Sequence, residues 1–576
     1  MSAESFIQQK AAAAIQAIYG TEVAETSLQV SVTRKEFEGD YTLVTFPLLK
    51  ITRQAPDVTG NAIGEWLVAN VPEIAAFNSV KGFLNLSFSP VYWNEALQSM
   101  AADDAFGQLP ATGRRIMVEF SSPNTNKPLH LGHIRNNLLG DSVSRILKAC
   151  GNEVIKSTIV NDRGVHICKS MYAWEKCFNG ATPESTGKKG DHLVGDCYVA
   201  YAKMEKEHPE IIDDVHRMLV QWEQGDKHVR DLWAMMNGWV YKGFDETYAA
   251  LGITFDQVDH ESETYLLGKE LVQKGLQTGV FVKDPDGSVW CDLTADGLDR
   301  KLVLRGDGTS VYITQDLGTA ERRFANYNLD SHVYVVGNEQ DYHFQVLKLI
   351  LKKLGFDWAD QIYHLSYGMV ELPEGKMKSR EGTVVDADDL IQSMYEEAKK
   401  TSEESGKLAD VSDQEKDRLY HMIGLGALKY FIIKVDPKKT MLFNPKESID
   451  FNGNTGPFIQ YTHARICSIL RKASVSFGPA DVNASVTPSA KEIRLTQLLS
   501  LYPAKVAEAG AALSPAVIAN YAYDLAKEFN QYYHETPILK EENQAVLKYR
   551  LELIAVMART LRSAMSLLGI ELPERM

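Results

Sequence analysis

The sequence opens with short apolar runs typical of strands, set between stretches with helical spacing. Over residues 1–110, a first helix precedes the strand-like runs LQVSVTR, YTLVTFPLL and FLNLSF, with a helical pattern around NAIGEWLVAN. The polar segment DDAFGQLPATG then indicates a linker, because Gly and Pro interrupt regular structure. We therefore expect a small N-terminal α+β domain over residues 1–110.

A strand–loop–helix–strand order follows between residues 114 and 160. The strand-like run RRIMVEFSS leads into the loop PNTNKP, and the helical pattern of HLGHIRNNLLGDSVSRILKACG ends at Gly151 before the strand EVIKSTIV. Later runs predicted as strands are SVYITQDLG, SHVYVVGNEQ and IYHLSYGMV. This order is typical of an α/β domain with a parallel sheet, which we expect at about 112–385.

Two long regions show mainly helical spacing. Residues 170–300 are helical and charged, and we expect them to form a helical insertion in the α/β domain. From about 386 to 576 the pattern is almost entirely helical, which predicts an all-α bundle. A chain of 576 residues is too long for one core, since single cores stop growing near roughly 250–300 residues.

Composition excludes several classes of protein. The apolar and charged fractions, 44% and 24%, are ordinary for a globular protein, and no apolar run approaches a membrane span. The first twenty residues lack a basic region before an apolar one, so a cytoplasmic location is expected. The six cysteines form no C-x-x-C pair, which suggests neither zinc nor a disulfide framework.

The net charge of −15 argues against nucleic-acid binding, because phosphate contacts need Lys and Arg. The local charge matters more than the total in a large protein. Between residues 421 and 472, eight basic residues face three acidic ones. On charge alone, a solvated helix face explains this segment better than an RNA-binding surface does.

The motif His130-Leu131-Gly132-His133 stands at the start of the helix after the first predicted parallel strand. Two imidazoles three residues apart share a helical face, and a helix N-terminus offers free N–H groups to an anion. Gly132 would let a flat ligand approach the backbone. Neither a dinucleotide-binding glycine motif nor a P-loop is present, so the motif suits ATP phosphates held in another way. Alone, ordinary surface or core histidines explain it better.

A second motif follows the last predicted strand. Residues 375–382, Gly-Lys-Met-Lys-Ser-Arg-Glu-Gly, form a basic loop flanked by glycines, which is suited to a triphosphate. A basic hairpin tip is the simpler reading of this loop in isolation. The two motifs occur in order, each beside a strand of one α/β unit, and that joint occurrence is specific.

The pair resembles the HIGH and KMSKS signatures of class I aminoacyl-tRNA synthetases. VEFSSPNTNKPLHLGHIRNNLLGD, LRGDGTSVYITQDLG, FNGNTGPFIQYTHARICSIL and the terminal LLGIELPERM resemble blocks of the arginyl-tRNA synthetase family over the whole chain. The resemblance implies a Rossmann-like catalytic domain at 112–385. It further implies an N-terminal domain that contacts the tRNA elbow and an anticodon-binding bundle at 386–576.

Site residues follow from the same resemblance. The family's arginine pocket falls on a set with two carboxylates, two amides and a phenol, which suits an α-ammonium and a guanidinium. The loop reads K-M-K-S-R-E rather than K-M-S-T-R-K, so Lys376 and Lys378 both remain candidates for contact with the transition state. The expected catalytic residues are His130, Gly132, His133, Lys376, Met377, Lys378 and Ser379, and the expected arginine-binding residues are Glu119, Asn124, Tyr312, Asp316 and Gln340.

The implied activity is that of an arginine–tRNA ligase with ATP as substrate, accompanied by Mg²⁺ and without zinc. The partners implied are tRNA, ATP and L-arginine, with no membrane, and a monomer is expected. Two alternatives remain open: a nucleotidyl transferase or synthetase for another amino acid, and an inactive relative that only binds tRNA.

The tRNA itself should meet basic and aromatic side chains in the C-terminal half, because unstacked bases need rings and phosphates need cations. The residues expected to bind tRNA are Tyr461, Arg465, Lys438 and Lys439, supported by Tyr521, Tyr532 and Tyr533.

Overall fold

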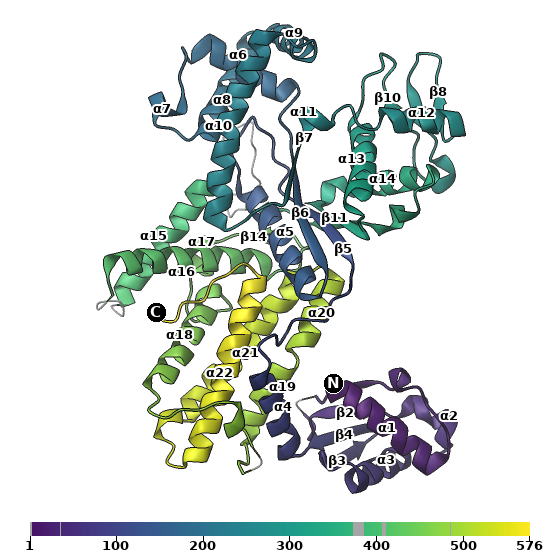
Figure 1. Ribbon diagram of the computed structural model, residues 1–576, viewed down its shortest axis with the longest axis vertical. Helices are drawn as coiled ribbons and strands as arrows, with labels where there is room; N and C mark the ends of the chain where they lie inside the picture. The colour runs from purple at the N-terminus through teal and green to yellow at the C-terminus, as the bar shows by residue number, and fades with distance from the viewer. Residues whose placement is uncertain (1–2, 35, 372–384, 406–410, 484) are drawn as a thin grey trace.

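The structure is a computed structural model that describes residues 3–34, 36–371, 385–405, 411–483 and 485–576. An N-terminal α+β unit lies beside a helical C-terminal bundle, and a parallel α/β unit with a helical insertion lies above them (Figure 1). The predicted fold class is thereby confirmed.

The N-terminal unit is an antiparallel sheet of order β1-β2-β4-β3 with its own core, which includes Ile7, Leu43 and Trp93. The predicted run YTLVTFPLL is a strand only as far as Val44, and a 3₁₀ turn containing Pro47 follows, since proline cannot donate to a sheet. The run IAAFNSV, which was not predicted, forms β3. The elements are α1 (Ala3–Tyr19), β1 (Val30–Val32), β2 (Tyr41–Val44), α2 (Leu49–Thr52), α3 (Pro56–Asn70), β3 (Ile74–Val80), β4 (Phe83–Phe88) and α4 (Pro90–Ala102).

The central sheet has five parallel strands in the order β12-β11-β5-β6-β7. Strand β5 lies in the middle, where Glu119 at its carboxyl end pairs with Ser157 of β6 and Tyr334 of β11. Ligands of open parallel sheets bind at such carboxyl ends, so this edge is where a site is sought. The elements are β5 (Arg115–Glu119), α5 (Leu131–Ala149), β6 (Glu153–Val160), β7 (Gln257–His260), α13 (Tyr312–Tyr327), β11 (Ser331–Gly337), α14 (Asp341–Lys353) and β12 (Ile362–Tyr367).

One predicted strand is wrong. SVYITQDLG was predicted as a strand, but helix α13 begins at Tyr312. Its buried side chains Ile313, Leu317, Ala320 and Phe324 recur with helical spacing along this sixteen-residue helix. That spacing becomes visible only when the window is extended beyond Gly318.

The insertion between β6 and β7 is helical as predicted, but the expected range 170–300 also contains strands. Strand β7 is an edge strand of the central sheet, and β8, β9 and β10 form a separate antiparallel sheet. The sequence of β7, Gln-Val-Asp-His, is too short and polar to give a strand signal. The elements are α6 (Val165–Cys177), α7 (Pro183–Thr186), α8 (Gly190–Glu207), α9 (Ile211–Glu223), α10 (Lys227–Leu251), α11 (Glu261–Thr264), α12 (Lys269–Thr278), β8 (Phe281–Lys283), β9 (Val289–Cys291) and β10 (Lys301–Leu304).

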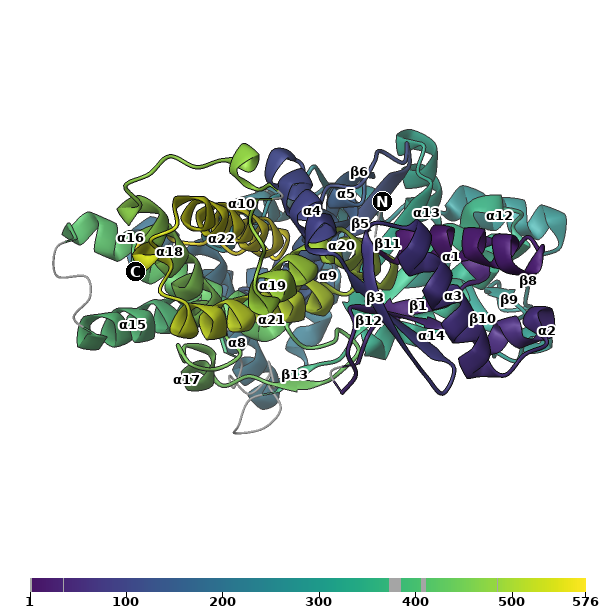
Figure 2. The ribbon, with the colours of Figure 1, turned by 90° about the horizontal axis from the view of Figure 1, so that it is seen from below.

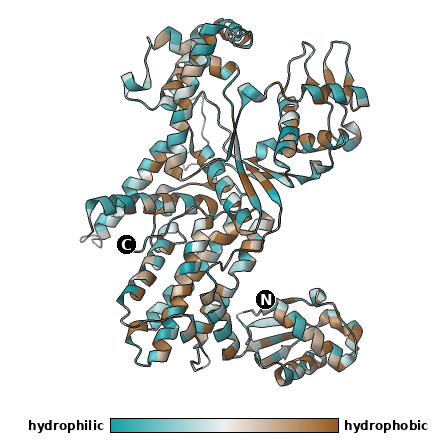
Figure 3. Cartoon of the chain, in the orientation of Figure 1, coloured by the Kyte–Doolittle hydropathy of each residue, from teal (hydrophilic) through white to brown (hydrophobic). Residues whose placement is uncertain are grey.

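The C-terminal helices pack directly on the central unit. Helix α5 contacts α16, α20, α21 and α22, and one continuous hydrophobic core joins the two parts. Figure 2 shows α19, α21 and α22 running side by side, and Figure 3 shows apolar residues gathered on the central strands. The elements are β13 (Val370–Glu371), α15 (Ala387–Ser405), α16 (Asp413–Ile433), β14 (Met441–Leu442), α17 (Pro445–Ser448), α18 (Gly456–Lys472), α19 (Ala490–Ser500), α20 (Tyr502–Ala512), α21 (Pro515–Glu535) and α22 (Gln544–Leu567).

Among the described residues, no helix is long and apolar enough to cross a membrane. All six cysteines are free thiols in the structure, and four of them are buried.

Candidate active site

The H-x-G-H motif begins helix α5 beside the carboxyl end of β5. His130 is the N-cap residue, and its Nδ1 accepts the backbone N–H of Gly132 at 3.1 Å. The Nδ1 of His133 accepts the backbone N–H of His130 at 3.2 Å, so the two side chains cap the helix reciprocally. The motif therefore fixes both imidazoles at the N-terminus of a helix, where anions bind favourably.

The protonation state of the two histidines follows from these contacts. Burial and the nearby ammonium of Lys127 lower the pKa of His130 to about 4, and burial lowers the pKa of His133 well below its ordinary value. Each neutral ring accepts a hydrogen bond at Nδ1, so its proton is on Nε2. Both residues are therefore neutral hydrogen-bond donors near pH 7 rather than cations.

Gly132 serves the geometry of the histidines. A Cβ at this position would lie 2.9 Å from Cε1 and 3.1 Å from Nδ1 of His130, too close for the ring to remain where it is. A side chain at position 132 would thus displace the His130 ring that caps the helix. The prediction of close approach by a flat ligand stays a prediction.

The five predicted arginine-binding residues all lie near the carboxyl edge of the sheet, on four separate segments of the chain. Glu119 ends β5, and Asn124 lies exposed in the following loop, where its backbone bridges to that of Asn161. Tyr312, which is 76% exposed, starts α13 one turn before Asp316. Gln340 is exposed in the turn after β11.

Asp316 and Glu119 have different surroundings. The carboxylate of Asp316 is partly exposed and lies 2.6 Å from Nε2 of His343. Glu119 is buried and forms an ion pair with Arg323, which also binds Asp259 at 2.7 Å. Glu119 is thus already paired within the chain, whereas Asp316 retains solvent-facing oxygen surface for a ligand.

Arg323 is the central cation of this buried network. Burial alone lowers the pKa of its guanidinium, but the carboxylates of Glu119 and Asp259 raise it above the ordinary value. The guanidinium therefore stays charged although its side chain is only 1% exposed. It fixes the Glu119 carboxylate at the end of the central strand.

Glu261, the first residue after β7, was not predicted from the sequence. It is buried, and the burial raises its pKa to about 7, with Asp162 and Asp316 adding to the shift. A cation nearby would favour the ionised form of this carboxyl group. Because β7 was not predicted, nothing in the sequence marked Glu261 as lying at the carboxyl edge.

The predicted basic loop, with Lys376, Met377, Lys378 and Ser379, lies outside the described residues. The chain re-enters the described structure at Val385, whose carbonyl accepts the backbone N–H of Leu131 at 3.0 Å. Asp386 then pairs with His130 as an isolated β-bridge. The backbone that follows the loop is thus directly attached to the H-x-G-H motif.

The predicted tRNA-binding residues fall in two separate places. Arg465 lies over the rings of Tyr461, at 4.8 Å, and of Tyr533, at 5.1 Å, which joins α18 to α21. Lys438 and Lys439 are exposed in the turn before β14, a strand that pairs with β13. All four had been predicted to bind tRNA from the C-terminal half of the chain.

That turn is fixed to the signature helix. Arg135 of α5 is fully buried and donates to the backbone carbonyls of Pro437 and Lys439 at 3.1 and 2.7 Å. Lys438 and Lys439 therefore lie beside the catalytic unit rather than on the outer helices.

Two predicted supports for RNA binding are wrong. Tyr521 and Tyr532 are buried and hydrogen-bonded to Leu498 and Glu492, so neither ring can stack on a base. Lys429 is also buried, where it donates to the Gly569 carbonyl, and burial lowers its pKa to about 8. The basic segment 421–472 thus presents fewer cations to solvent than its sequence suggested.

Comparisons with known proteins agree with this geometry. A family model described as tRNA synthetases class I (R), catalytic domain, matches residues 97–444, and a DALR anticodon binding domain model matches residues 459–576. An arginine–tRNA ligase of Bacteroides thetaiotaomicron is 57% identical, with 98% of each chain covered. One of Porphyromonas gingivalis is 54% identical over 100% of both chains. The solved arginyl-tRNA synthetase of Thermus thermophilus superposes with a TM-score of 0.84 at 26% identity, covering 100% of each chain.

The parallel sheet, the H-x-G-H helix and these matches together define a class I aminoacyl-tRNA synthetase. Within that class, the chain belongs to the arginine–tRNA ligase family.

Proposed function

We propose that this chain activates L-arginine with ATP and transfers it to tRNA. The carboxylate of arginine attacks the α-phosphorus of ATP, which forms arginyl-adenylate and releases diphosphate. The terminal ribose hydroxyl of the tRNA then attacks the arginyl carbonyl carbon, and AMP leaves. The observation that carries the proposal is the pair of neutral Nε2–H donors of His130 and His133 at the helix N-terminus.

In this proposal the histidines act electrostatically. ATP enters as its Mg²⁺ complex, and His130 and His133 donate hydrogen bonds to phosphate oxygens as negative charge shifts during attack. Donors held in place by capping bonds need no reorganisation at that moment, which is the source of their effect. Lys376 and Lys378 supply cations from the basic loop, with Met377 and Ser379 beside them in its sequence.

The arginine pocket is proposed at Glu119, Asn124, Tyr312, Asp316 and Gln340. Asp316 supplies the carboxylate for the guanidinium, because its oxygens are partly exposed at the start of α13. Glu119 is held in place by Arg323, and Asn124, Tyr312 and Gln340 offer polar groups from the surrounding loops. A planar five-donor substrate satisfies such a set better than an ammonium does.

The tRNA is proposed to span the molecule. Residues 1–110 would contact its elbow, and the helices of 386–576 would read the anticodon with Tyr461 and Arg465. Lys438 and Lys439 would bind phosphates closer to the catalytic unit, since Arg135 fixes their turn against α5. A monomer is proposed as the working unit, with the domain boundaries near residues 111 and 386.

Pyrophosphate exchange with each of the twenty amino acids, with and without tRNA, tests this function. Arginine-dependent exchange that requires tRNA is the expected result. Exchange supported better by another amino acid would favour a synthetase of different specificity. Tight tRNA binding without any exchange would identify a relative that only binds RNA.

A further inference from the structure

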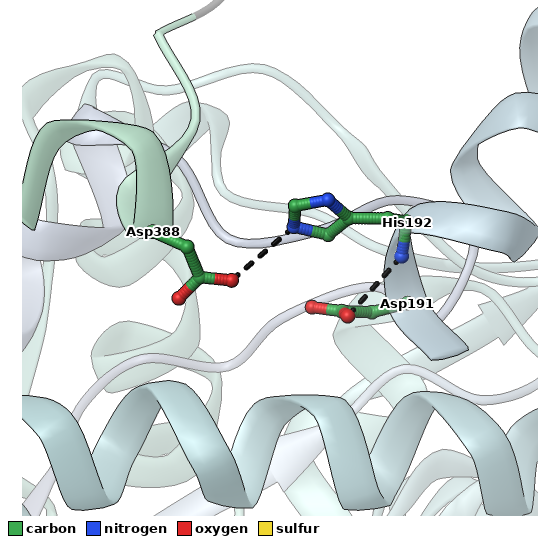
Figure 4. A group of neighbouring side chains, drawn as sticks. All are labelled: Asp191, His192 and Asp388. Carbon is green, nitrogen blue, oxygen red and sulfur yellow. Dashed lines mark hydrogen bonds and ion pairs between the residues drawn. The ribbon is translucent and has the colours of Figure 1, made fainter. Parts of the chain in front are cut away.

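A charged cluster joins the insertion to the segment that follows the basic loop. Asp191, His192 and Asp388 converge there, with His192 from α8 pointing at Asp388 of α15 (Figure 4). Their spacing would suit a metal ion, but the Lys189 ammonium lies among them. It donates to Asp388 at 2.6 Å and to Asp191 at 3.3 Å. The cluster therefore already contains its cation.

The cluster is well ordered by its hydrogen bonds. Thr247 of α10 is buried and donates to Oδ1 of Asp388 at 2.9 Å, while Lys189 binds Oδ2. His192 lies 3.2 Å from Asp388 and 3.3 Å from Asp386. Two helices of the insertion thus hold the first residues of α15 through charge-assisted bonds, which are stronger than neutral ones.

The segment held in this way supports the H-x-G-H motif. Ala387 donates its backbone N–H to the Leu129 carbonyl at 3.0 Å, and Leu131 donates to the Val385 carbonyl at the same distance. His130 lies between these two bonds, opposite Asp386. Any shift of residues 385–387 would therefore move the backbone on both sides of His130.

A hollow lies between α8 and the H-x-G-H motif. A cavity of about 300 Å³ separates α8 from the motif, with Lys127, Leu129, His130, His192, Tyr198 and Asp386 in its lining. At its edges, α8 meets this part of the chain in two places: the charged cluster holds Asp386 and Asp388, and Gly195 packs closely against Pro128. The charged cluster is thus one structural link between α8 and the position of the His130 ring.

We propose that Lys189 and His192 are positioning residues for His130, acting through Asp388 and Asp386 on the backbone of residues 385–387. This inference rests on the proposed function for its effect on catalysis, but the structural link itself can be measured without activity. A misplacement of about 1 Å at a reacting group costs on the order of a hundredfold in rate. Partial loosening of the backbone at residues 385–387 should lower the rate about tenfold.

The test compares Lys189→Met and Asp388→Asn with the matched control Lys188→Met. Lys188 is the preceding residue of the chain and forms an exposed ion pair with Asp196 at 2.6 Å, so the control removes the same chemistry outside the cluster. We expect both cluster variants to lower kcat of pyrophosphate exchange about tenfold while KM for arginine stays within about twofold. The double variant should lose less than the product of the two single losses, because both changes break one interaction.

Hydrogen exchange followed by mass spectrometry supplies the second reading. In both cluster variants, peptides containing the amides of Leu131 and Ala387 should exchange their hydrogens faster than in the wild type. In Lys188→Met, the exchange rate of the same peptides should be unchanged. Thr247→Val, which removes one hydroxyl and keeps the volume, should give a smaller change in the same direction. This milder variant also serves if Lys189→Met does not fold.

The outcomes separate the two proposals. If the wild-type protein showed no arginine-dependent pyrophosphate exchange, the proposed function would be wrong. The hydrogen-exchange measurement would still test the positioning role of the cluster. Unchanged exchange at Leu131 and Ala387 would overturn the positioning role, whatever happens to kcat. A rise in KM for arginine with kcat preserved would also overturn it, because the cluster would then act on substrate binding.

Discussion

His133 accepts the backbone N–H of His130 through Nδ1, and the two imidazole rings lie 4.0 Å apart. This hydrogen bond places the ring proton of His133 on Nε2, and it fixes the backbone position of His130. The H-x-G-H motif is thus a folded unit before any substrate arrives. Predictions about pH and about single substitutions follow from it.

The first prediction concerns pH. His130 has its pKa lowered to about 4 by burial and by Lys127, so it stays neutral as the pH falls from 8 to 5. Protonation of this residue should therefore reduce kcat/KM for arginine-dependent exchange only near pH 4. His130→Asn keeps a side chain that can cap the helix and serves as the control. An acid limb near pH 6.5 that disappears in this variant would contradict the prediction.

The second prediction concerns the signature side chains. His133→Ala and Lys376→Ala should each lower kcat by roughly a hundredfold, the usual effect of losing one donor to transition-state charge, with little rise in KM for arginine. Lys378→Ala is measured beside them, because the two loop lysines compete for one role. His208→Ala, at an exposed site of the insertion, should change neither constant. Steady-state kinetics of all four variants would also decide which loop lysine matters. A variant with normal turnover removes its residue from the mechanism.

The third prediction concerns stability. Arg323→Met leaves the buried carboxylates of Glu119 and Asp259 without their shared cation, which should cost about 3–5 kcal/mol of unfolding free energy. The neighbouring Arg322→Met removes a more exposed bond to Asp259 and should cost less than about 1 kcal/mol. Urea unfolding of both variants checks this. Similar costs for the two would show that the buried network contributes little.

The fourth prediction concerns the amino acid. Asp316→Asn should raise KM for arginine roughly tenfold to a hundredfold, because a hydrogen bond to a charged group contributes about 1.5–3 kcal/mol. Lysine should remain a poor substrate, since a pocket for a planar fork leaves polar groups unpaired around an ammonium. Asp360→Asn, which changes an exposed carboxylate before β12, is the control. Arginine kinetics unaffected by Asp316→Asn would remove this residue from the pocket.

The fifth prediction concerns tRNA. Neutralising Lys438 and Lys439 should weaken binding of every tRNA about equally and flatten its salt dependence, because each phosphate contact releases counterions. Arg465→Ala, which takes the cation from between the rings of Tyr461 and Tyr533, should instead weaken the preference for the cognate tRNA. Filter binding at two salt concentrations measures both effects, with Arg471→Ala as the control. Point variants are preferred to truncation near residue 385, since α5 packs against the C-terminal helices.

Much of the fold could be predicted where local pattern and tertiary role agree. FLNLSF and EVIKSTIV form β4 and β6 over their full length, because alternating apolar positions in the first run and β-branched residues in the second are typical of strands. Helix α5 was predicted to end at Gly151, and the structure ends it at Ala149 with Gly151 at a positive φ. Strand β7 was not predicted, because a strand at the edge of a sheet need not be apolar.

The residues and the motif of the candidate site could be predicted from the sequence, but the surroundings of these side chains in the fold could not. The H-x-G-H motif gave both histidines, but their neutrality depends on burial by segments far away in sequence. Glu119 was recognised, whereas its partner Arg323 lies 204 residues later and has no motif of its own. Tyr521 and Tyr532 were misjudged because the buried face of α21 depends on its packing partners.

The bond between Ser142 Oγ of α5 and the Leu567 carbonyl at the end of α22 joins residues 425 positions apart. During synthesis, the signature helix emerges in the first third of the chain, yet its covering helices arrive near the end. At about 5–20 residues per second, a ribosome needs roughly 20–85 s to add that stretch. Over this interval the side of α5 that packs on the C-terminal helices lacks part of its native cover, and such exposed apolar surface favours aggregation. Completion of the catalytic unit is thus among the last events of folding, although its signature is among the first segments translated.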